Sequence, residues 1–465
     1  MAIEFPHETA ASDRLGWGPI VAWSLGTVGP VTLLYLVTSA YLFFMTDLMK
    51  VSGAVAGLLL FVVRIYDMFA DPLMGHISDR TQSRMGRRRP WMLAGALAMV
   101  AGCVAMFTVP GALVASGGPS IVGWALAALF VYFTGYTMFN VPYMAMPAEM
   151  TDGFQDRTRL MSARVVFVSL SSLLGAALAP RLIDAFGGGV RSYEITAWVI
   201  GAIGLATMFA CVAATGRLRA TTATPVAAPL LAQMRVALTN RPFMVLILTK
   251  LLLLLSMSAQ TSTMFFFVRH LLHQDLAVAS NIAIAQTLGM LAALPLWVRI
   301  GRRWQKQQLF RVASGANAVI LLSWLLVSAG EPQGLLLLRA VLLGAFAGGS
   351  LLMGQSMLPD TMEFDYRRSG LRREGAYSGI YSMVEKAGFA FGPLLVGGML
   401  SAAGYDPAAA SAQGGELSPN AMLAVYAGVA VIPAVATALC ALVLRGYTLT
   451  EDELKSMTPP ANPRL

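Results

Sequence analysis

The sequence predicts an all-α membrane protein with twelve transmembrane helices in two six-helix bundles. Three observations lead to this prediction: a high apolar content, apolar runs of spanning length along the whole chain, and basic residues concentrated in alternate loops. Hydrophobic residues make up 57% of the 465 residues and charged residues only 12%, whereas a soluble domain carries about 25% charged residues. The chain is therefore predicted to be an integral, multi-pass membrane protein surrounded by lipid.

The predicted spans are apolar runs of the ~20 residues that are needed to cross a bilayer. In the first half they are expected at residues 20–46, 53–78, 91–113, 121–146, 161–186 and 194–216. In the second half they are expected at residues 243–268, 276–299, 309–329, 335–358, 376–402 and 419–445. Residues 217–242 are more polar and hold four arginines, so we interpret them as a connecting loop. The predicted units are 1–216, 217–242, 243–445 and a tail, 446–465.

Basic residues lie in the loops after even-numbered spans. The loop after span two contains RTQSRMGRRRP, whereas the loop after span three, GALVASGGPS, contains no charge. By the positive-inside rule, the even-numbered loops and both termini are predicted to be cytoplasmic. The net charge of +9 is explained by these loops, so no nucleic-acid partner is expected. The N-terminus lacks the pattern of a cleaved signal peptide. We expect a monomer in the cytoplasmic (inner) membrane.

Enzyme signatures are missing from the sequence. It contains no HExxH, GxSxG or P-loop motif and no Cys/His cluster. Cys103, Cys211 and Cys440 lie far apart in apolar segments and are predicted to be small buried residues without a disulfide or metal framework. We therefore expect neither an enzyme nor a cofactor, and no appended soluble domain suggests a signalling receptor.

Three charged residues share one stripe of the second span. Arg64, Asp67 and Asp71 follow one another at helical spacings of three and four residues, which places them on the same helix face. A charge near the centre of a bilayer costs at least ~2.5–3.5 kcal/mol, so such residues usually face a wet cavity or a partner. The pair of carboxylates is interpreted as the cation site of a transporter.

Four stretches of the chain resemble a known family. They are RIYDMFADPLMGHISDRTQSRMGRRRP from Arg64, NVPYMAMPAEMTDGFQDRTRL from Asn140, SMLPDTMEFDYRRSGLRREGAYSG from Ser356, and GYTLTEDEL near the end. Together they resemble the glycoside–pentoside–hexuronide:cation symporters of the major facilitator superfamily. The resemblance covers nearly the whole chain. It implies symport of a small solute with Na⁺ or H⁺, by alternating access around a central cavity.

The resemblance also implies a cation site. Asp67 and Asp71 match the family's two cation-binding carboxylates, Lys386 matches the family's lysine beside them, and Asn140 is a further candidate. Two like charges one turn apart resist joint ionisation, so one carboxyl either binds a proton or requires a cation. Oxygen ligands also suit a hard cation such as Na⁺. The choice between Na⁺ and H⁺ stays open, as does a purely structural network with Arg64 and Lys386.

The substrate-binding residues depart from those of the sugar-transporting members. Asn140 stands where such members have an acidic residue, Met144 stands where they have a tryptophan, and the first span has no charge before Asp47. A second hypothesis is therefore an amphipathic lipid, resembling a lysophospholipid, or another apolar metabolite. The other candidates to contact substrate are polar or charged residues within spans, which could equally bond between helices: Tyr35, Tyr143, Arg164, Gln260, Gln355, Tyr381 and Lys386. Lys250 either reaches the cytoplasmic surface or faces the cavity.

Charged residues near the cytoplasmic helix ends are candidates for gating. They are Asp79, Arg80, Arg84, Arg87, Glu149, Asp360, Asp365, Arg372 and Arg373. We expect them to form charge networks that latch the cytoplasmic side when the carrier is closed there. Because exposed ion pairs contribute little individually, such a latch needs several of them.

Overall fold

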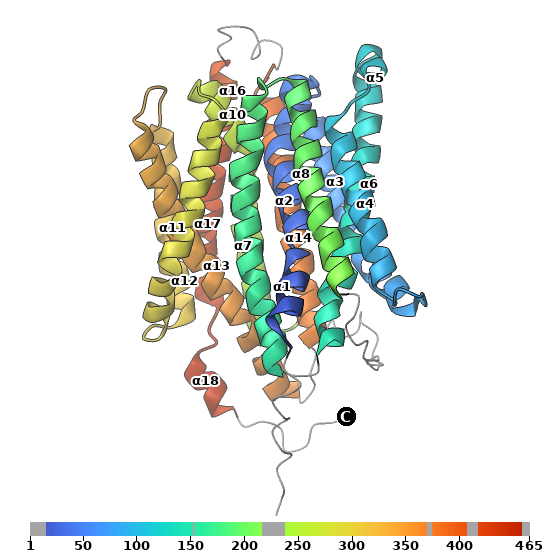
Figure 1. Ribbon diagram of the computed structural model, residues 1–465. Helices are drawn as coiled ribbons and strands as arrows, with labels where there is room; N and C mark the ends of the chain where they lie inside the picture. Colours follow the sequence, from blue (N-terminus) through green and yellow to red (C-terminus); the bar gives the residue numbers. More distant parts are fainter. Residues whose placement is uncertain (1–14, 152–153, 216–237, 370–373, 407–416, 458–465) are drawn as a thin grey trace, which may run out of the picture.

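The computed structural model describes residues 15–151, 154–215, 238–369, 374–406 and 417–457, and these residues form a helical bundle (Figure 1). Twelve helices are long and apolar enough to cross a membrane. The predicted fold class and number of spans are therefore confirmed. Most of the predicted connecting loop lies outside the described residues.

The helices of the first half follow the predicted order. They are α1 (Trp17–Leu25) and α2 (Val28–Phe43), which together form the first span, α3 (Gly53–Arg80), α4 (Arg89–Phe107), α6 (Gly118–Met150), α7 (Phe154–Ala185) and α8 (Val190–Ala214). A short helix, α5 (Gly111–Ser116), precedes α6. Asparagine or serine side chains cap several helices in this chain; at α3, Ser52 Oγ accepts from the Val55 N–H at 3.4 Å.

The second half repeats this layout. Its helices are α10 (Arg241–Phe266), α11 (Ala277–Gly301), α12 (Lys306–Ser323), α13 (Gln333–Ser369), α14 (Glu374–Ala402), and α16 (Pro419–Tyr426) with α17 (Ile432–Val443) in the last span. The tail contains α18 (Glu451–Ser456). The tenth span was predicted to end at residue 358, but α13 continues to Ser369. Hydropathy detects only the lipid-facing part of a helix, and the extension is rich in charge.

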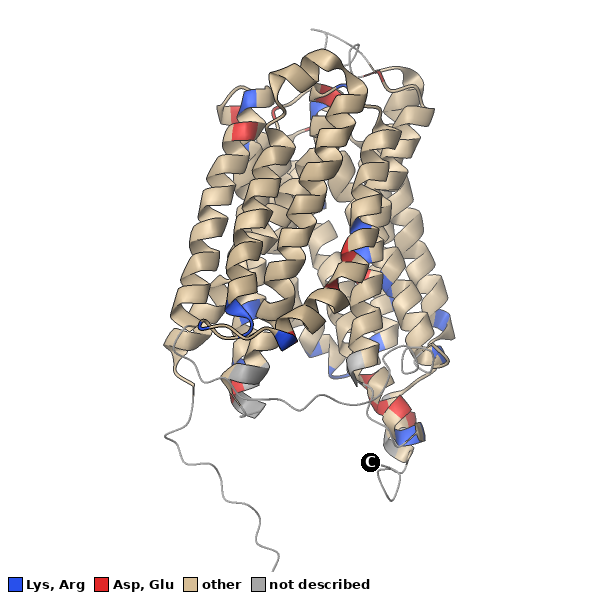
Figure 2. Ribbon diagram, turned by 90° about the vertical axis from the view of Figure 1, so that its right-hand side faces the viewer, with Lys and Arg blue, Asp and Glu red and all other residues tan. Residues whose placement is uncertain are grey.

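The two ends of the bundle differ in charge. We call the end at which α1 begins and α18 lies the basic end, and the opposite end the far end; they are the lower and upper ends in Figure 1. Most charged residues lie at the two ends, and a small group lies midway along the helices (Figure 2). The positive-inside rule places the basic end in the cytoplasm, and this orientation stays a prediction.

Contacts between the halves close the far end. The halves meet mainly along α3 with α14, α7 with α11, and α2 with α10. Ser280 Oγ on α11 donates to the Ala177 carbonyl on α7 at 2.9 Å. The Ala54 N–H on α3 donates to Ser401 Oγ on α14 at 2.8 Å. The side chain of Glu385, midway along the bundle, is 51% exposed, so the packing between helices is looser there than at the far end.

Charged pairs at the basic end join elements of the same half. Asp79 pairs with Arg88 at 3.1 Å, and Lys306 pairs with Asp360 at 2.6 Å. The Asp79–Arg88 pair is of the kind expected for a charge network between helix ends, and the latch on the cytoplasmic side stays a prediction. The side chain of Glu149 and the whole of Arg372 and Arg373 lie outside the described residues.

Glycines let α11 and α13 approach closely. A Cβ on Gly344 would overlap the backbone oxygen of Gln286. Small residues at such crossings are typical of membrane helices, where close packing takes the place of the hydrophobic effect.

Replacing Gly344 with alanine is expected to destabilise the protein by about 1–3 kcal/mol, the usual cost of overpacking. The measurement is the melting temperature in detergent, which should fall by several degrees. Gly315→Ala on α12 is the matched control, because a Cβ there meets nothing within 4 Å and alanine favours a helix by up to ~1 kcal/mol. Equal melting temperatures for the two variants would contradict the packing argument.

Candidate functional site

The charged residues of α3 and α14 come together halfway along the bundle. Asp67 and Asp71 lie one turn apart on α3, and Lys386 reaches them from α14 in the other half of the chain. The Lys386 Nζ atom is 2.9 Å from Asp67 Oδ2 and 2.6 Å from Asp71 Oδ2. It also donates to the Asp67 carbonyl at 3.2 Å. One ammonium group thus lies between the two carboxylates.

Arg64 completes the charge balance of this cluster. Its Nη1 is 4.0 Å from Asp67 Oδ2, and its guanidinium carbon lies 4.6 Å from the centre of the Phe133 ring. With all four groups ionised, two positive charges face two negative charges. Asp67 is 0% exposed, so this balance matters, because a buried charge without a partner is costly.

Thr137 on α6 is a member of the site that sequence reasoning missed. Its hydroxyl is 2.7 Å from Asp67 Oδ1 and 3.1 Å from Asp71 Oδ1. A threonine in an apolar span carries no sequence signal of its own, although Thr137 lies one turn before the candidate Asn140. Two carboxylates and a hydroxyl supply oxygen atoms of the kind that Na⁺ or a proton binds.

Lys250 neither reaches the surface nor stands free in the cavity. Its Nζ is 2.8 Å from Glu385 Oε2 and 3.2 Å from the centre of the Tyr381 ring. The side chain of Lys250 is 7% exposed and that of Glu385 is 51% exposed. Because Glu385 precedes Lys386, a second ion pair lies directly beside the first. An anionic substrate group would have to displace Glu385 to reach Lys250.

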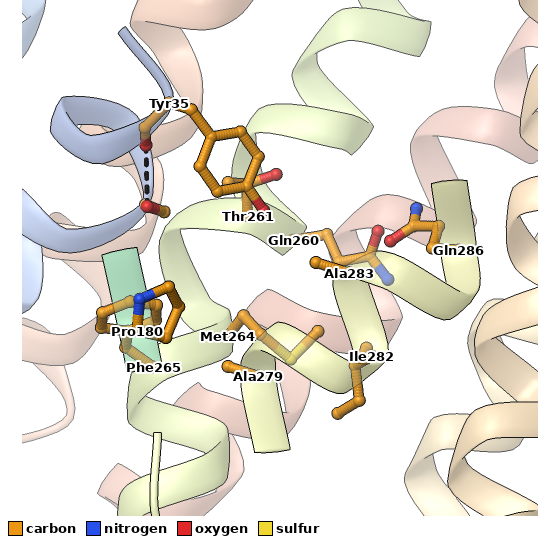
Figure 3. A pocket seen from close by; sticks show the side chains of 11 residues that line it. Tyr35, Pro180, Gln260, Thr261, Met264, Phe265, Ala279, Ile282, Ala283 and Gln286 are labelled. Carbon is orange, nitrogen blue, oxygen red and sulfur yellow. Dashed lines mark hydrogen bonds between the residues drawn. The ribbon is translucent and has the colours of Figure 1, made fainter. Parts of the chain in front are cut away.

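A pocket between the halves brings together two predicted substrate residues, Tyr35 on α2 and Gln260 on α10. Its cavity volume is about 30 Å³ in this conformation, which is room for about two water molecules. In Figure 3 the Tyr35 ring points from α2 toward Thr261 and Gln260. Gln260 Nε2 is buried and has no hydrogen-bond partner among the described residues. The remaining lining is mixed: Ser39, Pro180, Met264, Phe265, Ala279, Ile282, Ala283 and Gln286.

The other predicted substrate residues lie elsewhere. Tyr143 is 1% exposed; its ring stacks on Trp23 with centroids 4.8 Å apart, and its hydroxyl is 2.7 Å from Thr27 Oγ1. It is therefore part of the packing of the first half. Arg164 lies beside the Tyr143 phenol. Asn140 is half-buried, Met144 is exposed at 37%, and Gln355 is exposed on α13.

Residues 22–451 match the family described as MFS/sugar transport proteins. The chain belongs to this family. The matched residues include the cluster around Asp67, Asp71 and Lys386, and the pocket between the halves. The resemblance noted in the sequence is thereby confirmed, and the helical bundle described above is that of a membrane transporter.

Relatives match this transporter over most of its length. The uncharacterized symporter YnaJ of Bacillus subtilis (strain 168) is 30% identical over 439 residues, which cover 91% of this chain and 90% of that protein. The glucuronide carrier protein homolog of Escherichia coli (strain K12) is 26% identical over 462 residues, or 96% and 95% of the two chains. The sodium-dependent lysophosphatidylcholine symporter 1 of Xenopus tropicalis is 29% identical over 141 residues, or 30% of this chain and 26% of that protein.

A solved structure shares the fold. It is a bacterial homologue of the human lysosomal transporter Spinster in an inward-facing and unoccupied conformation. The TM-score is 0.66 at 14% identity, and the match covers 96% of this chain and 98% of the other. At this identity the likeness concerns the fold alone, and it agrees with a major facilitator architecture.

Proposed function

We propose that the transporter is a symporter that couples the movement of a glycoside-type solute to Na⁺ or H⁺ bound at Asp67 and Asp71. The observation that carries this proposal is the place of Lys386. Its ammonium group lies between two carboxylates from the other half of the chain, which is where a coupling cation would bind. The names of two relatives matched over 90% and 95% of their length, a symporter and a glucuronide carrier homolog, agree with it.

Competition between Lys386 and the cation gives a coupling mechanism. A Na⁺ ion or a proton that binds the carboxylates weakens their hold on the ammonium group. The bond between α3 and α14 is then released, and the two halves are free to move relative to one another. A cation contributes to coupling only if it binds differently to the two conformations, and the ion pair across the halves provides that difference.

The pocket beside Tyr35 and Gln260 is the proposed substrate site. Its hydroxyl and amide groups suit the hydroxyl groups of a sugar, and Met264 and Phe265 suit its apolar face. Since α2 and α7 belong to one half and α10 and α11 to the other, a movement of the halves widens this pocket, and a solute bound there contacts both of them. The apolar-solute hypothesis is less well supported, because the lysophosphatidylcholine symporter matches only 30% of the chain.

A binding screen tests the proposal. We expect a glycoside or glucuronide to raise the melting temperature of the purified transporter, because a ligand that binds the folded state stabilises it. The shift should depend on Na⁺ or on pH, and Gln260→Leu should reduce it. If lysolipids raised the melting temperature while every glycoside had no effect, the proposed substrate class would be wrong. Melting-temperature shifts that did not change with Na⁺ or with pH would contradict cation coupling.

The same proposal includes an orientation and an assembly. The basic end faces the cytoplasm of a cell whose inner membrane holds the transporter. The transporter works as a monomer, because the cation site and the pocket are both built from one chain.

A further inference from the structure

A second cluster of titratable residues joins the halves at the far end. Asp47 lies on a π-helical turn, η2 (Phe44–Leu48), and His270 lies on another, η4 (Phe267–Leu271). His270 Nε2 is 2.6 Å from Asp47 Oδ1. The hydroxyl of Tyr405, just after α14, is 2.7 Å from the same oxygen and 3.0 Å from His270 Nε2. All three side chains are buried, and none belongs to the cation site or the pocket.

Asp47 and His270 occupy equivalent places in the two halves. The segments FFMTDLMK, residues 43–50, and FFVRHLLH, residues 266–273, align without a gap. In each the helix passes into a π-helical turn, with Met49 N–H donating to the Phe44 carbonyl and Leu272 N–H to the Phe267 carbonyl, both at 3.1 Å. Each segment ends on a residue in the left-handed region, Lys50 with φ 58° and His273 with φ 52°. An acid from one half thus contacts a base at the equivalent position of the other half.

The geometry determines where the protons lie. A ring nitrogen and a carboxylate oxygen 2.6 Å apart repel one another unless a proton lies between them. The Thr46 hydroxyl also donates to Asp47 Oδ2 at 3.0 Å. Burial and the Asp47 carboxylate raise the pKa of the Tyr405 phenol, so Tyr405 remains a donor. Asp47 Oδ1 is therefore within hydrogen-bonding distance of both His270 Nε2 and the Tyr405 hydroxyl.

We propose that Asp47, His270 and Tyr405 form a second proton-binding site, separate from the cation site, which holds the far end closed while His270 is positively charged. An imidazolium beside the carboxylate makes a buried pair with no net charge. When His270 becomes neutral, its Nε2–H can still donate to Asp47, but a negative charge remains buried without compensation, which is costly. Opening the far end then exposes Asp47 to water and removes the cost.

The surroundings of His270 are mainly aromatic. Aromatic rings enclose the pair: Phe43 lies 5.8 Å from the His270 ring and Phe266 lies 5.7 Å from the Tyr405 ring, between centroids. The phenol of Tyr193 faces Asp47. Tyrosines ordinarily titrate near pH 10, whereas an imidazole titrates near 6.5.

Other charged groups also lie near this cluster. They are Lys50, Asp406, Asp184, which accepts the Leu276 and Ala277 N–H groups, and Arg269, which is 3.9 Å from Asp275. Of the described histidines at the far end, His273 is exposed and belongs to the surface. The His270→Gln variant therefore decides whether a response near neutral pH comes from His270.

The test measures the width of the far end against pH. Spin labels on Ser116→Cys and Gln333→Cys, both exposed and one in each half, report that width by pulsed electron paramagnetic resonance. The native cysteines are fully buried. We expect one short distance at acidic pH and a growing longer population as the pH rises through neutrality. His270→Gln should abolish this response, and His273→Asn, the matched control, should keep it.

A second, more conservative variant keeps the test informative if His270→Gln does not fold. Tyr405→Phe removes one donor to Asp47 and keeps the ring, so opening should begin about one pH unit lower than in the parent, since a hydrogen bond to a charged group contributes roughly that much. A parent distance that did not change with pH would overturn the proposal. So would a pH response that survived in His270→Gln, or a Tyr405→Phe profile identical to that of the parent.

Discussion

Replacing Asp67 with asparagine is expected to abolish cation-driven uptake, with a loss of more than 100-fold. Asp67 is fully buried, and without its charge Arg64 and Lys386 face Asp71 alone. The surplus positive charge repels an incoming cation by about 4 kcal/mol at 4 Å and an effective dielectric constant of 20. That energy corresponds to roughly a thousandfold loss of affinity. The measurement is uptake into proteoliposomes driven by a Na⁺ or pH gradient.

Two controls separate coupling from structure. Asp79→Asn changes an acid on the same helix whose side chain is 57% exposed; because the predicted latch depends on several ion pairs, losing this one should alter uptake less than about twofold. Asp67→Asn combined with Lys386→Met restores the charge balance. If the cluster were only structural, this double variant would recover cation-driven uptake. We expect it to recover thermal stability and exchange of solute without any response to the gradient.

Replacing Gly397 with alanine is expected to prevent the far end from closing. A Cβ on Gly397 would overlap the backbone oxygen of Gly53, at the crossing of α14 and α3 between the halves. Overpacking of about 1–3 kcal/mol would shift the conformational equilibrium by roughly ten- to a hundredfold. Uptake should fall accordingly, since the transport cycle includes the closed state.

The neighbouring residue provides the control for this variant. A Cβ on Gly398 meets nothing within 4 Å, so Gly398→Ala should transport at the parent rate. The spin-label pair at residues 116 and 333 should report a longer distance in Gly397→Ala at every pH. A short distance and full uptake in that variant would show that the crossing does not limit closure.

Much of the architecture is predictable from the sequence because lipid imposes a simple rule on it. Each span must be apolar and about 20 residues long, so twelve runs predict twelve helices. Charges within a span are conspicuous for the same reason, and Asp67 and Asp71 were therefore readily found. Hydropathy is uninformative where a helix leaves the bilayer, which is why the charged extension of α13 to Ser369 was missed.

Partners across the fold were harder to predict. Thr137 is an ordinary residue of an apolar helix, and only its 2.7 Å contact with Asp67 distinguishes it. The pairing of Lys250 with Glu385 depends on how α10 and α14 pack. The pairing of Asp47 with His270 did leave a signal, the repeated segments at residues 43 and 266. The repeat can be recognised only when the sequences of the two halves are aligned with each other.

The glycines at the crossing of α3 and α14 have a consequence for how the bound ion is sensed. These two helices carry Asp67 and Lys386 at mid-height and Gly53 and Gly397 at the far end. Asp67 and Gly53 lie fourteen residues apart on α3, or about 21 Å along a straight helix. The proposed cation site and the glycine crossing at the far end thus lie on the same pair of helices, α3 and α14. A cation that separates α3 from α14 at the proposed site would also change the angle between the two helices at the glycine crossing. No relay of intermediate residues is needed for this coupling.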